Sequence, residues 1–320
     1  MASDLTLRGK KRSELIGYAD PMVVHPGDSI QFMVSTEFTE YEAKLVRLIH
    51  GDENPEGPGF KTEAVGGFSE TLKGCHQTTY PGSYIYTQSG KLNNFDSGLS
   101  IQAWIFATKP VGDGYQTIVA QQTNGAGFGL YVNPKGRITL RLSNTEETID
   151  VSTDRSLENN QWYFVFGTFA QQEGTATVIQ RQCGRWPNIA ADSEHSEKIS
   201  LGKLHTTNAP VTIAATGISD TEEFVPRQCF NGKIESPRIF SRPLSFDEIG
   251  HLASNGAPSE VPDLVAAWDF SQTPANSTTV EDISNNRRHG EVVNFPMRGL
   301  TGHNWTGREF SREAAPGQYG

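Results

Sequence analysis

The sequence predicts an all-β protein with one short helix, near residues 246–254. Three observations support this. Turn-forming residues are abundant, with 32 glycines and 17 prolines; the apolar residues fall in short alternating runs; and a strong helix-start signature occurs at one place. At 320 residues the chain exceeds the usual size of one domain, so we expect two or three units.

The helix signature lies within residues 230–256. Ser245 is expected to cap the helix, and Glu248, three residues later, completes a capping box. Leu244 and Ile249 occupy the positions of a hydrophobic staple, so the helix should begin at residue 246. The pair at 255–256 is Asn-Gly, which is typical of a helix end.

A strand is expected just before this helix, at residues 233–240. Ile234 and Ile239 face the same side only if a bulge intervenes, and Pro237 suits a bulge because it lacks a backbone donor. This strand, turn and helix resemble the closing segment of laminin-G-like, concanavalin-A-like β-sandwiches. The resemblance implies such a sandwich over residues 76–256, a fold that hosts many functions.

Alternating patterns place the other strands of this sandwich. Residues 125–129 are a glycine cluster that we interpret as a hairpin entry, because no helix follows to hold a phosphate. The expected elements are a central strand at 100–107, a strand at 115–121, a hairpin of 128–132 with 137–142, an aromatic strand at 161–169, and a returning strand at 175–181.

The two ends of the chain are expected to differ from the sandwich. Residues 1–16 are predicted to be a flexible basic arm, either solvated or docked on an acidic partner subunit. Residues 17–75 form a small β unit with strands at 22–24, 30–35 and 41–49, in which Leu48 and Ile49 are candidate buried residues. Strands so few and short need support from elsewhere. Residues 257–320 are a linker and strands that complete a sandwich, with a truncated end.

Charge and cysteine content limit the partners and the location. The net charge of −10 argues against nucleic acid or an anionic membrane as a partner. No run approaches the ~20 apolar residues of a membrane span, and no apolar signal-peptide core follows the basic residues near the N-terminus. Cys75, Cys183 and Cys229 have no metal-type spacing, so we expect reduced thiols and a cytoplasmic protein.

The most specific stretch is residues 46–61, VRLIHGDENPEGPGFK, in which a strand runs into a loop carrying His50, Asp52 and Glu53. Such side chains could bind a metal or move a proton, and a strand-end turn explains them equally well. Together with GYADPMVVHPGDSIQFMVS before it and NFPMRGLTGHNWTG near the C-terminus, this run resembles the start of the N,N-dimethylformamidase large subunit.

This second resemblance implies a function for the whole enzyme. Such an enzyme hydrolyses an N-substituted formamide to formate and an amine, with a mononuclear iron held by two tyrosines and a glutamate beyond the present segment. This chain would be a non-catalytic scaffold and assembly region that contacts the remainder of the large subunit and a small subunit, with no cofactor of its own. Possible phenolate ligands within this chain are Tyr80, Tyr84 and Tyr86. The period-two spacing of Tyr84 and Tyr86 is also explained by their lying on one strand. Whether the chain is a fragment or a separate gene product stays open.

Tests for catalytic patterns assign no catalytic residue. No strand carries the alternating carboxylates of sandwich glycosidases, and neither G-x-S-x-G nor H-E-x-x-H occurs. The eight histidines are scattered without ligand spacing. Asp96, Asp113 and Asp282 lie in loops where laminin-G-like domains sometimes hold calcium, and a solvated carboxylate is the alternative in each case.

The alternative function is a free-standing laminin-G-like module that binds a glycan or a protein. Trp186, in the long polar loop at 182–198, could stack on a sugar, anchor a partner chain, or fold onto its own sandwich. Trp305 is the second candidate for such a contact. His50 and Asp52 complete the set of possible partner or ligand contacts.

Overall fold

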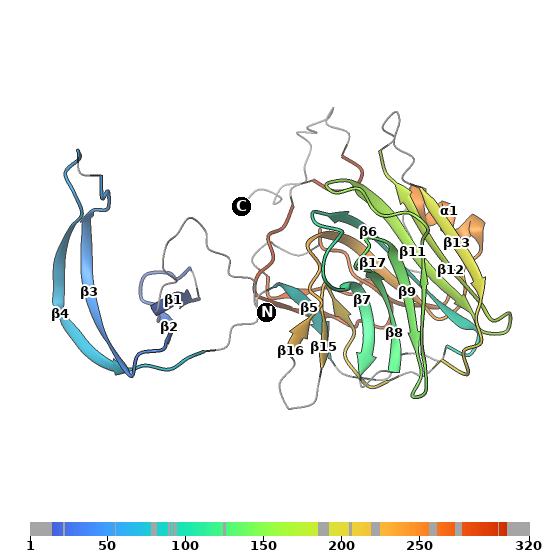
Figure 1. Ribbon diagram of the computed structural model, residues 1–320, viewed down its shortest axis with the longest axis horizontal. Helices are drawn as coiled ribbons and strands as arrows, with labels where there is room; N and C mark the ends of the chain where they lie inside the picture. Colours follow the sequence, from blue (N-terminus) through green and yellow to red (C-terminus); the bar gives the residue numbers. More distant parts are fainter. Residues whose placement is uncertain are drawn as a thin grey trace. The chain divides into compact units, whose positions relative to one another are not determined.

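The computed structural model describes most of the chain in two compact units, Met1–Thr79 and Tyr80–Gly320 (Figure 1). Each unit is described by itself. The described residues are 15–21, 23–54, 56–77, 82–88, 90, 92, 95–123, 126–184, 192–204, 207–218, 225–255, 261–272, 277–299 and 301–305.

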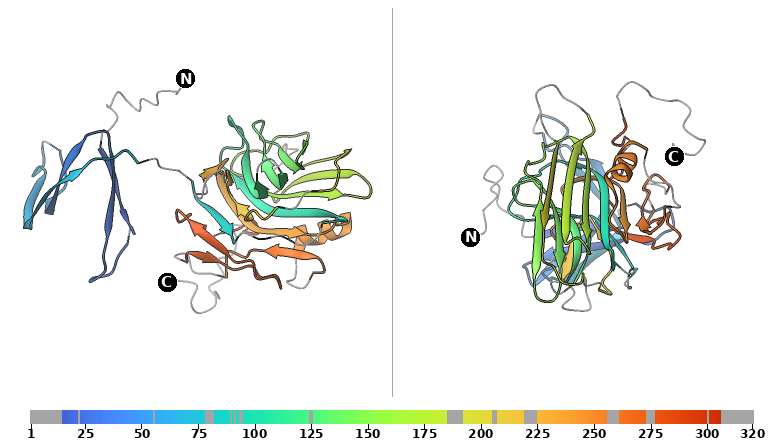
Figure 2. Two further views of the ribbon diagram at one scale, coloured as in Figure 1. Left: turned by 90° about the horizontal axis from the view of Figure 1, so that it is seen from below. Right: turned by 90° about the vertical axis from the view of Figure 1, so that its right-hand side faces the viewer.

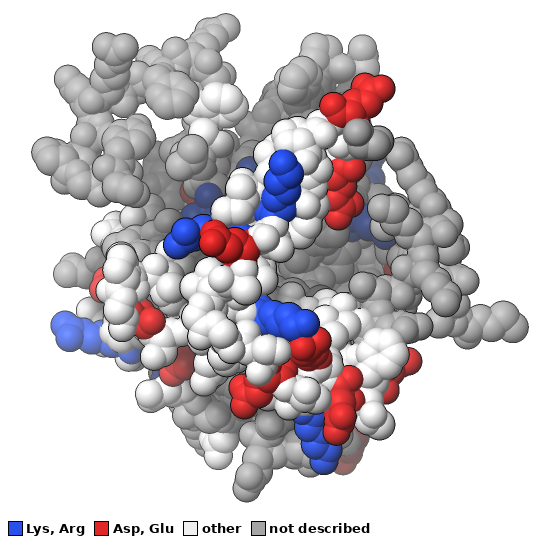
Figure 3. All heavy atoms as spheres, turned by 90° about the vertical axis from the view of Figure 1, so that its left-hand side faces the viewer, with Lys and Arg blue, Asp and Glu red and all other residues white. Residues whose placement is uncertain are grey.

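The first unit consists of two antiparallel pairs of strands. β1 (Leu15–Asp20) pairs with β2 (Gln31–Thr36), and β3 (Glu40–His50) pairs with β4 (Lys61–Lys73). On the face viewed in Figure 3, uncharged side chains lie between small groups of Lys or Arg and Asp or Glu. Both hairpins expose large apolar side chains.

Several expectations for this unit were wrong. The strand predicted at 22–24 is absent at the described positions 23 and 24, and residues 15–16 belong to β1 rather than to the basic arm. Leu48 and Ile49 are 59% and 56% exposed, so they are not core residues. The long strand β4 was not predicted, because two consecutive glycines, Gly66 and Gly67, interrupt the strand pattern of its sequence. In the structure these glycines have positive φ angles of 64° and 66°.

The second unit is a β-sandwich of two antiparallel sheets (Figures 1 and 2). The eight-stranded sheet runs in the order β10 (Thr148–Ser152), β9 (Ile138–Ser143), β8 (Ala126–Val132), β7 (Gln116–Thr123), β14 (Thr212–Ile213), β5 (Tyr84–Thr87), β20 (Gly290–Val293), β19 (Thr279–Val280). The six-stranded sheet runs in the order β13 (Ser193–Lys198), β12 (Thr175–Gln182), β11 (Trp162–Ala170), β6 (Gly98–Ala107), β17 (Gly232–Phe240), β18 (Leu264–Ala267). A small hairpin joins β15 (Thr216–Ile218) to β16 (Val225–Arg227). The predicted fold class is confirmed.

The main core lies between the two sheets. Strand alternation directs Phe128, Leu130 and Val132 of β8 inward, where all three are fully buried. A buried side chain of this size contributes about 1.5–3 kcal/mol relative to an exposed one. A second apolar cluster lies on the outer face of the six-stranded sheet, where Ile249 and Leu252 of α1 (Phe246–Asn255) join Phe164 of β11.

Local predictions for the sandwich hold where they rest on turn chemistry. The hairpin of β8 and β9 turns at Asn133, whose Oδ1 accepts hydrogen bonds from the N–H groups of Lys135 and Arg137 at 3.0 and 3.1 Å. In β17 the pairing with β6 shifts between Glu235 and Arg238, around Pro237, which confirms the bulge.

The segment after α1 supplies strands to both sheets. β18 joins the six-stranded sheet and β20 joins the eight-stranded one, and the loop between them is held by the buried side chain of Asp282. Asp282 Oδ1 accepts from the N–H groups of Ala267 and Ser284, and Oδ2 accepts from Ser284 Oγ and the N–H of Arg288, all at 2.7–2.9 Å. Its carboxylate therefore stabilises the fold and is buried, unlike the solvated loop carboxylate considered from the sequence.

Two further findings concern the whole described chain. The three cysteines form no disulfide. Within the described ranges, none of the helical structure is long and apolar enough to cross a membrane.

Replacing Asp282 with alanine should lower the free energy of unfolding by about 3 kcal/mol, because four donors lose one buried acceptor. Urea unfolding followed by tryptophan fluorescence measures this. Asp113→Ala, at an exposed loop carboxylate, is the matched control and should change stability by less than about 0.5 kcal/mol. Equal effects of the two substitutions would contradict the structural role.

Candidate functional site

The main candidate site lies on the outer face of the six-stranded sheet, around Trp104. Strand pairing places Trp104 of β6 between Phe164 of β11 and Glu235 of β17. The ring of His303 stacks on Trp104 with a centroid distance of 4.3 Å and an interplanar angle of 20°. Residues far apart in the chain therefore meet on this face.

Glu235 holds His303 through both carboxylate oxygens. His303 Nδ1 lies 2.9 Å from Oε1, and the backbone N–H of His303 donates to Oε2 at 2.9 Å. Burial raises the pKa of Glu235, but the hydrogen bonds from His303 outweigh it and leave the pKa below its usual value. Because both oxygens are engaged, the pair fixes the position of the chain at His303.

A buried guanidinium lies beside this pair. Arg238 is 7% exposed, and its Cζ is 5.8 Å from the Trp104 ring centroid. Its Nε and Nη1 atoms have no hydrogen-bond partner within the described part of the chain. Burial lowers the pKa of Arg238, while the charges of Asp269 and Glu235 oppose that shift. The guanidinium thus supplies positive charge that acts on Glu235.

A second polar cluster lies on the eight-stranded sheet. Arg141 donates from Nε and Nη2 to the two oxygens of Asp150, each at 2.7 Å, and the Tyr115 hydroxyl donates to Asp150 Oδ2 at 2.7 Å. The Arg141 Cζ lies 4.2 Å from the Tyr115 ring centroid. Burial raises the pKa of neighbouring Tyr131 to about 12. The carboxylate of Asp150 therefore joins β9, β10 and the residue before β7.

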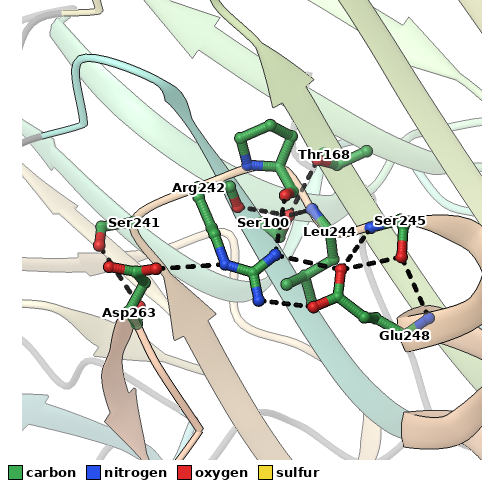
Figure 4. A network of polar contacts seen from close by, with 9 residues as sticks. Ser100, Thr168, Ser241, Arg242, Leu244, Ser245, Glu248 and Asp263 are labelled. Atoms are coloured by element: carbon green, nitrogen blue, oxygen red, sulfur yellow. Dashed lines mark hydrogen bonds and ion pairs between the residues drawn. The ribbon is translucent and has the colours of Figure 1, made fainter.

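A third network surrounds the start of α1 (Figure 4). Arg242 donates to both carboxylate oxygens of Glu248, at 2.6 and 3.1 Å, and its Nε lies 3.2 Å from Asp263. The Ser245 N–H donates to Glu248 Oε2 at 2.8 Å, and the Glu248 N–H lies 3.4 Å from Ser245 Oγ. Ser100 Oγ accepts from the N–H of Leu244 at 3.0 Å. The predicted capping box is therefore present and is reinforced by an arginine that the sequence did not reveal.

The contact residues singled out from the sequence do not meet at one site. His50 Nδ1 lies 2.9 Å from the carbonyl oxygen of Gly59, and Asp52 Oδ1 accepts from the N–H of Asn54 at 2.9 Å, so both have local turn roles in the first unit. Trp305, in the second unit, is 53% exposed. Trp186 lies outside the described residues. Their roles in contacting a partner or ligand stay predictions.

The two described tyrosines considered as iron ligands lie on β5. The rings of Tyr84 and Tyr86 are 6.4 Å apart, and the Tyr86 hydroxyl donates to Glu291 Oε2 at 2.7 Å. Glu291 is the cross-strand neighbour of Tyr86 on β20, and its hydrogen bond raises the pKa of that phenol. The cross-strand position of Glu291 accounts for this contact as part of the sheet. Among the described residues, no group of three or more His, Cys, Asp or Glu could hold a metal ion.

Comparison with known families agrees with this geometry. Residues 79–250 match the model of the concanavalin A-like lectin/glucanases superfamily. The chain belongs to that superfamily. Residues 1–78 and 251–320 lie outside the match.

Curated relatives extend the similarity to both units. The chain is 32% identical to the N,N-dimethylformamidase beta subunit of Paracoccus aminophilus, over 97% of its own length and 43% of that protein. It is 29% identical to the corresponding subunit of an Alcaligenes species, over 95% of its own length and 42% of that protein. The resemblance found in the sequence is confirmed, and the chain spans less than half the length of these relatives.

Among solved structures, a putative carbohydrate binding protein from Bacteroides ovatus ATCC 8483 is 13% identical with a TM-score of 0.48, covering 76% of this chain and 68% of that one.

Sequence reasoning missed the cluster at Trp104. Part of the cluster could have been predicted, because side chains alternate between the two faces of a strand. This alternation places Trp104 on the face opposite to that of the inward-facing Ile101, Ala103 and Ile105. The run that ends the family resemblance also contains His303. Nothing in the sequence connects the two, since their contact depends on where the chain returns to the sheet.

The position of Gly302 makes the His303 contact testable. A Cβ atom there would lie 2.5 Å from Glu235 Oε2, so Gly302→Ala should displace Glu235 and lower the free energy of unfolding by about 1–3 kcal/mol. Chemical denaturation followed by circular dichroism measures the loss of stability. Gly114→Ala, where a Cβ meets nothing within 4 Å, is the control. A Gly302→Ala variant as stable as the wild type would show that the contact between Glu235 and His303 is not needed for stability.

The Arg242–Glu248 pair predicts a pH dependence. Its hydrogen bonds lower the pKa of Glu248 from 4.5 to about 2, so Glu248 stabilises the fold above pH 4.5 and that contribution is lost as the pH falls toward 2. Glu248→Gln should therefore destabilise at pH 7, with a difference from wild type that shrinks between pH 4.5 and 2. Urea titrations across this range, with exposed Glu146→Gln as control, measure it. A difference independent of pH would be inconsistent with the pairing.

Proposed function

We propose that this chain is a non-catalytic scaffold and assembly region of an amidohydrolase similar to N,N-dimethylformamidase. The observation that carries the proposal is similarity to two beta subunits along 95–97% of the chain, which includes both units. A match to the sandwich alone would fit any member of a functionally diverse superfamily.

In this proposal the whole enzyme hydrolyses a small N-substituted formamide to formate and an amine. A mononuclear iron would polarise the amide carbonyl and activate water, with its ligands outside the present residues. The partners would be the remainder of the large subunit and a small subunit, in the cytoplasm. The absence of disulfides among the three cysteines is compatible with that location.

The polar clusters support a scaffold role. Glu235 is occupied by His303, Asp150 by Arg141 and Tyr115, and Glu248 by Arg242 and Ser245. Each of these carboxylates uses its oxygens to join elements of the sandwich. A general base needs an oxygen within hydrogen-bond reach of a substrate or water proton. These groups therefore favour holding the fold over performing chemistry.

A second candidate function is a module that binds a glycan or a protein. The 53% exposure of Trp305 favours it, because an exposed indole can stack on a sugar or anchor a partner. Calorimetry against a glycan panel, with and without calcium, tests this candidate. A flat titration in every case would remove the glycan-binding form of the idea.

Activity and metal content test the leading proposal. The purified 320-residue chain should release no amine from N,N-dimethylformamide and should contain iron well below one atom per chain. An amine assay and elemental analysis measure this, with the Paracoccus aminophilus enzyme as positive control. Stoichiometric iron together with amine release would overturn the scaffold proposal.

A further inference from the structure

The β3–β4 hairpin of the first unit exposes an unusual amount of apolar surface. Leu45, Val46, Leu48, Ile49 and Phe68 are between 45% and 59% exposed. An isolated two-stranded hairpin is marginally stable in water, and independent stability generally needs three or more strands with an apolar face. Exposed apolar surface on such an element marks an interaction site.

One edge of this hairpin is available for pairing. β4 covers one side of β3, and within the described residues no strand pairs with the other side. That edge is 11 residues long. A long, unpaired edge with apolar side chains is a template for another strand.

We propose that β3 pairs antiparallel with β3 of a second copy of this chain, across a twofold axis at Leu45. The two hairpins then form one four-stranded sheet in the order β4-β3-β3-β4, which reaches the strand number that a lone hairpin lacks. This inference does not rest on the proposed function, because the dimer can form whether or not the chain belongs to an amidohydrolase.

The sequence of β3 is complementary to itself in this register. Leu45 faces Leu45 of the second copy, Lys44 faces Val46, and Ala43 faces Arg47, so no like charges lie directly opposite. Lys44 already pairs with Glu42 on its own strand at 2.9 Å, which offsets its charge. At the ends of the paired strands, Glu40 of one copy approaches His50 of the other.

Antiparallel self-pairing along the free edge of β4 is less favourable than self-pairing along β3. An antiparallel self-pairing of β4 centres on Gly67 and places Lys61 opposite Lys73. Gly66 and Gly67 also have φ angles of 64° and 66°, which interrupt the extended backbone needed for a continuous ladder. The pairing of β3 with β4 also shifts between Lys44 and Val46 and between Leu48 and His50, but no residue of β3 has a positive φ angle. Charge and the extended backbone therefore favour β3.

Sedimentation of the intact 320-residue chain tests the dimer. We expect a concentration-dependent dimer, and Leu45→Arg should raise its dissociation constant more than about tenfold by placing like charges opposite each other on the axis. Met297→Arg, at an apolar side chain that is 99% exposed in the second unit, is the matched control and should leave the dimer intact.

Disulfide trapping tests the register. On the axis, two Cα atoms of an antiparallel pair lie about 4.5–5.5 Å apart, within the range a disulfide spans. Cys75 and Cys183 are exposed and are first replaced with serine to remove competing thiols. In that background Leu45→Cys should give a covalent dimer on mild oxidation, whereas Glu53→Cys in the hairpin loop and the background itself should not.

Three results would overturn the proposal. A monomer at every concentration would assign the apolar hairpin to a different polypeptide. A dimer unaffected by Leu45→Arg would place the interface elsewhere. A dimer sensitive to Leu45→Arg that Leu45→Cys fails to cross-link would exclude the twofold pairing.

Discussion

The carboxylate of Asp282 is the interaction on which the second unit most depends. It joins β18 in one sheet to the loop that leads to β20 in the other, through four hydrogen bonds to buried or half-buried donors. The indole of Trp268 reinforces this loop by donating to the carbonyl of Arg288 at 3.0 Å. The sandwich is therefore completed by residues that follow α1 in the chain.

Charge in this unit is used mainly to hold strands and loops together. The carboxylates of Glu235, Asp150 and Glu248 each accept from partners on other elements or turns, in geometry that fixes their position. Such groups favour a rigid framework. Arg238 differs, because two of its nitrogen atoms lie buried without a partner among the described residues. Gln102, which faces Arg238 across β6 and β17, likewise has a buried Oε1 atom without a hydrogen-bond partner among the described residues.

The two units differ in how far they bury their apolar side chains. In the second unit strand alternation sends one set of residues between the sheets and a second set under α1. In the first unit the hairpins have no facing layer of their own among the described residues, and side chains such as Leu48 and Phe32 stay exposed. The superfamily match covers residues 79–250 of the chain, while the similarity to dimethylformamidase beta subunits covers both units. The first unit and the segment after residue 250 thus lie outside the match to the general sandwich family.

The sequence by itself determined the fold class, the hairpin turn at Asn133, the bulge at Pro237 and the capping box of Ser245 and Glu248. Each of these depends on residues close together in the chain, whose chemistry acts over one turn or one pair of strands. Only the tertiary structure decided the order of the strands, the exposure of Leu48 and Ile49, and the contact of His303 with Trp104 and Glu235. These depend on residues brought together from distant parts of the chain, and the pattern along a strand does not say which face will meet another layer.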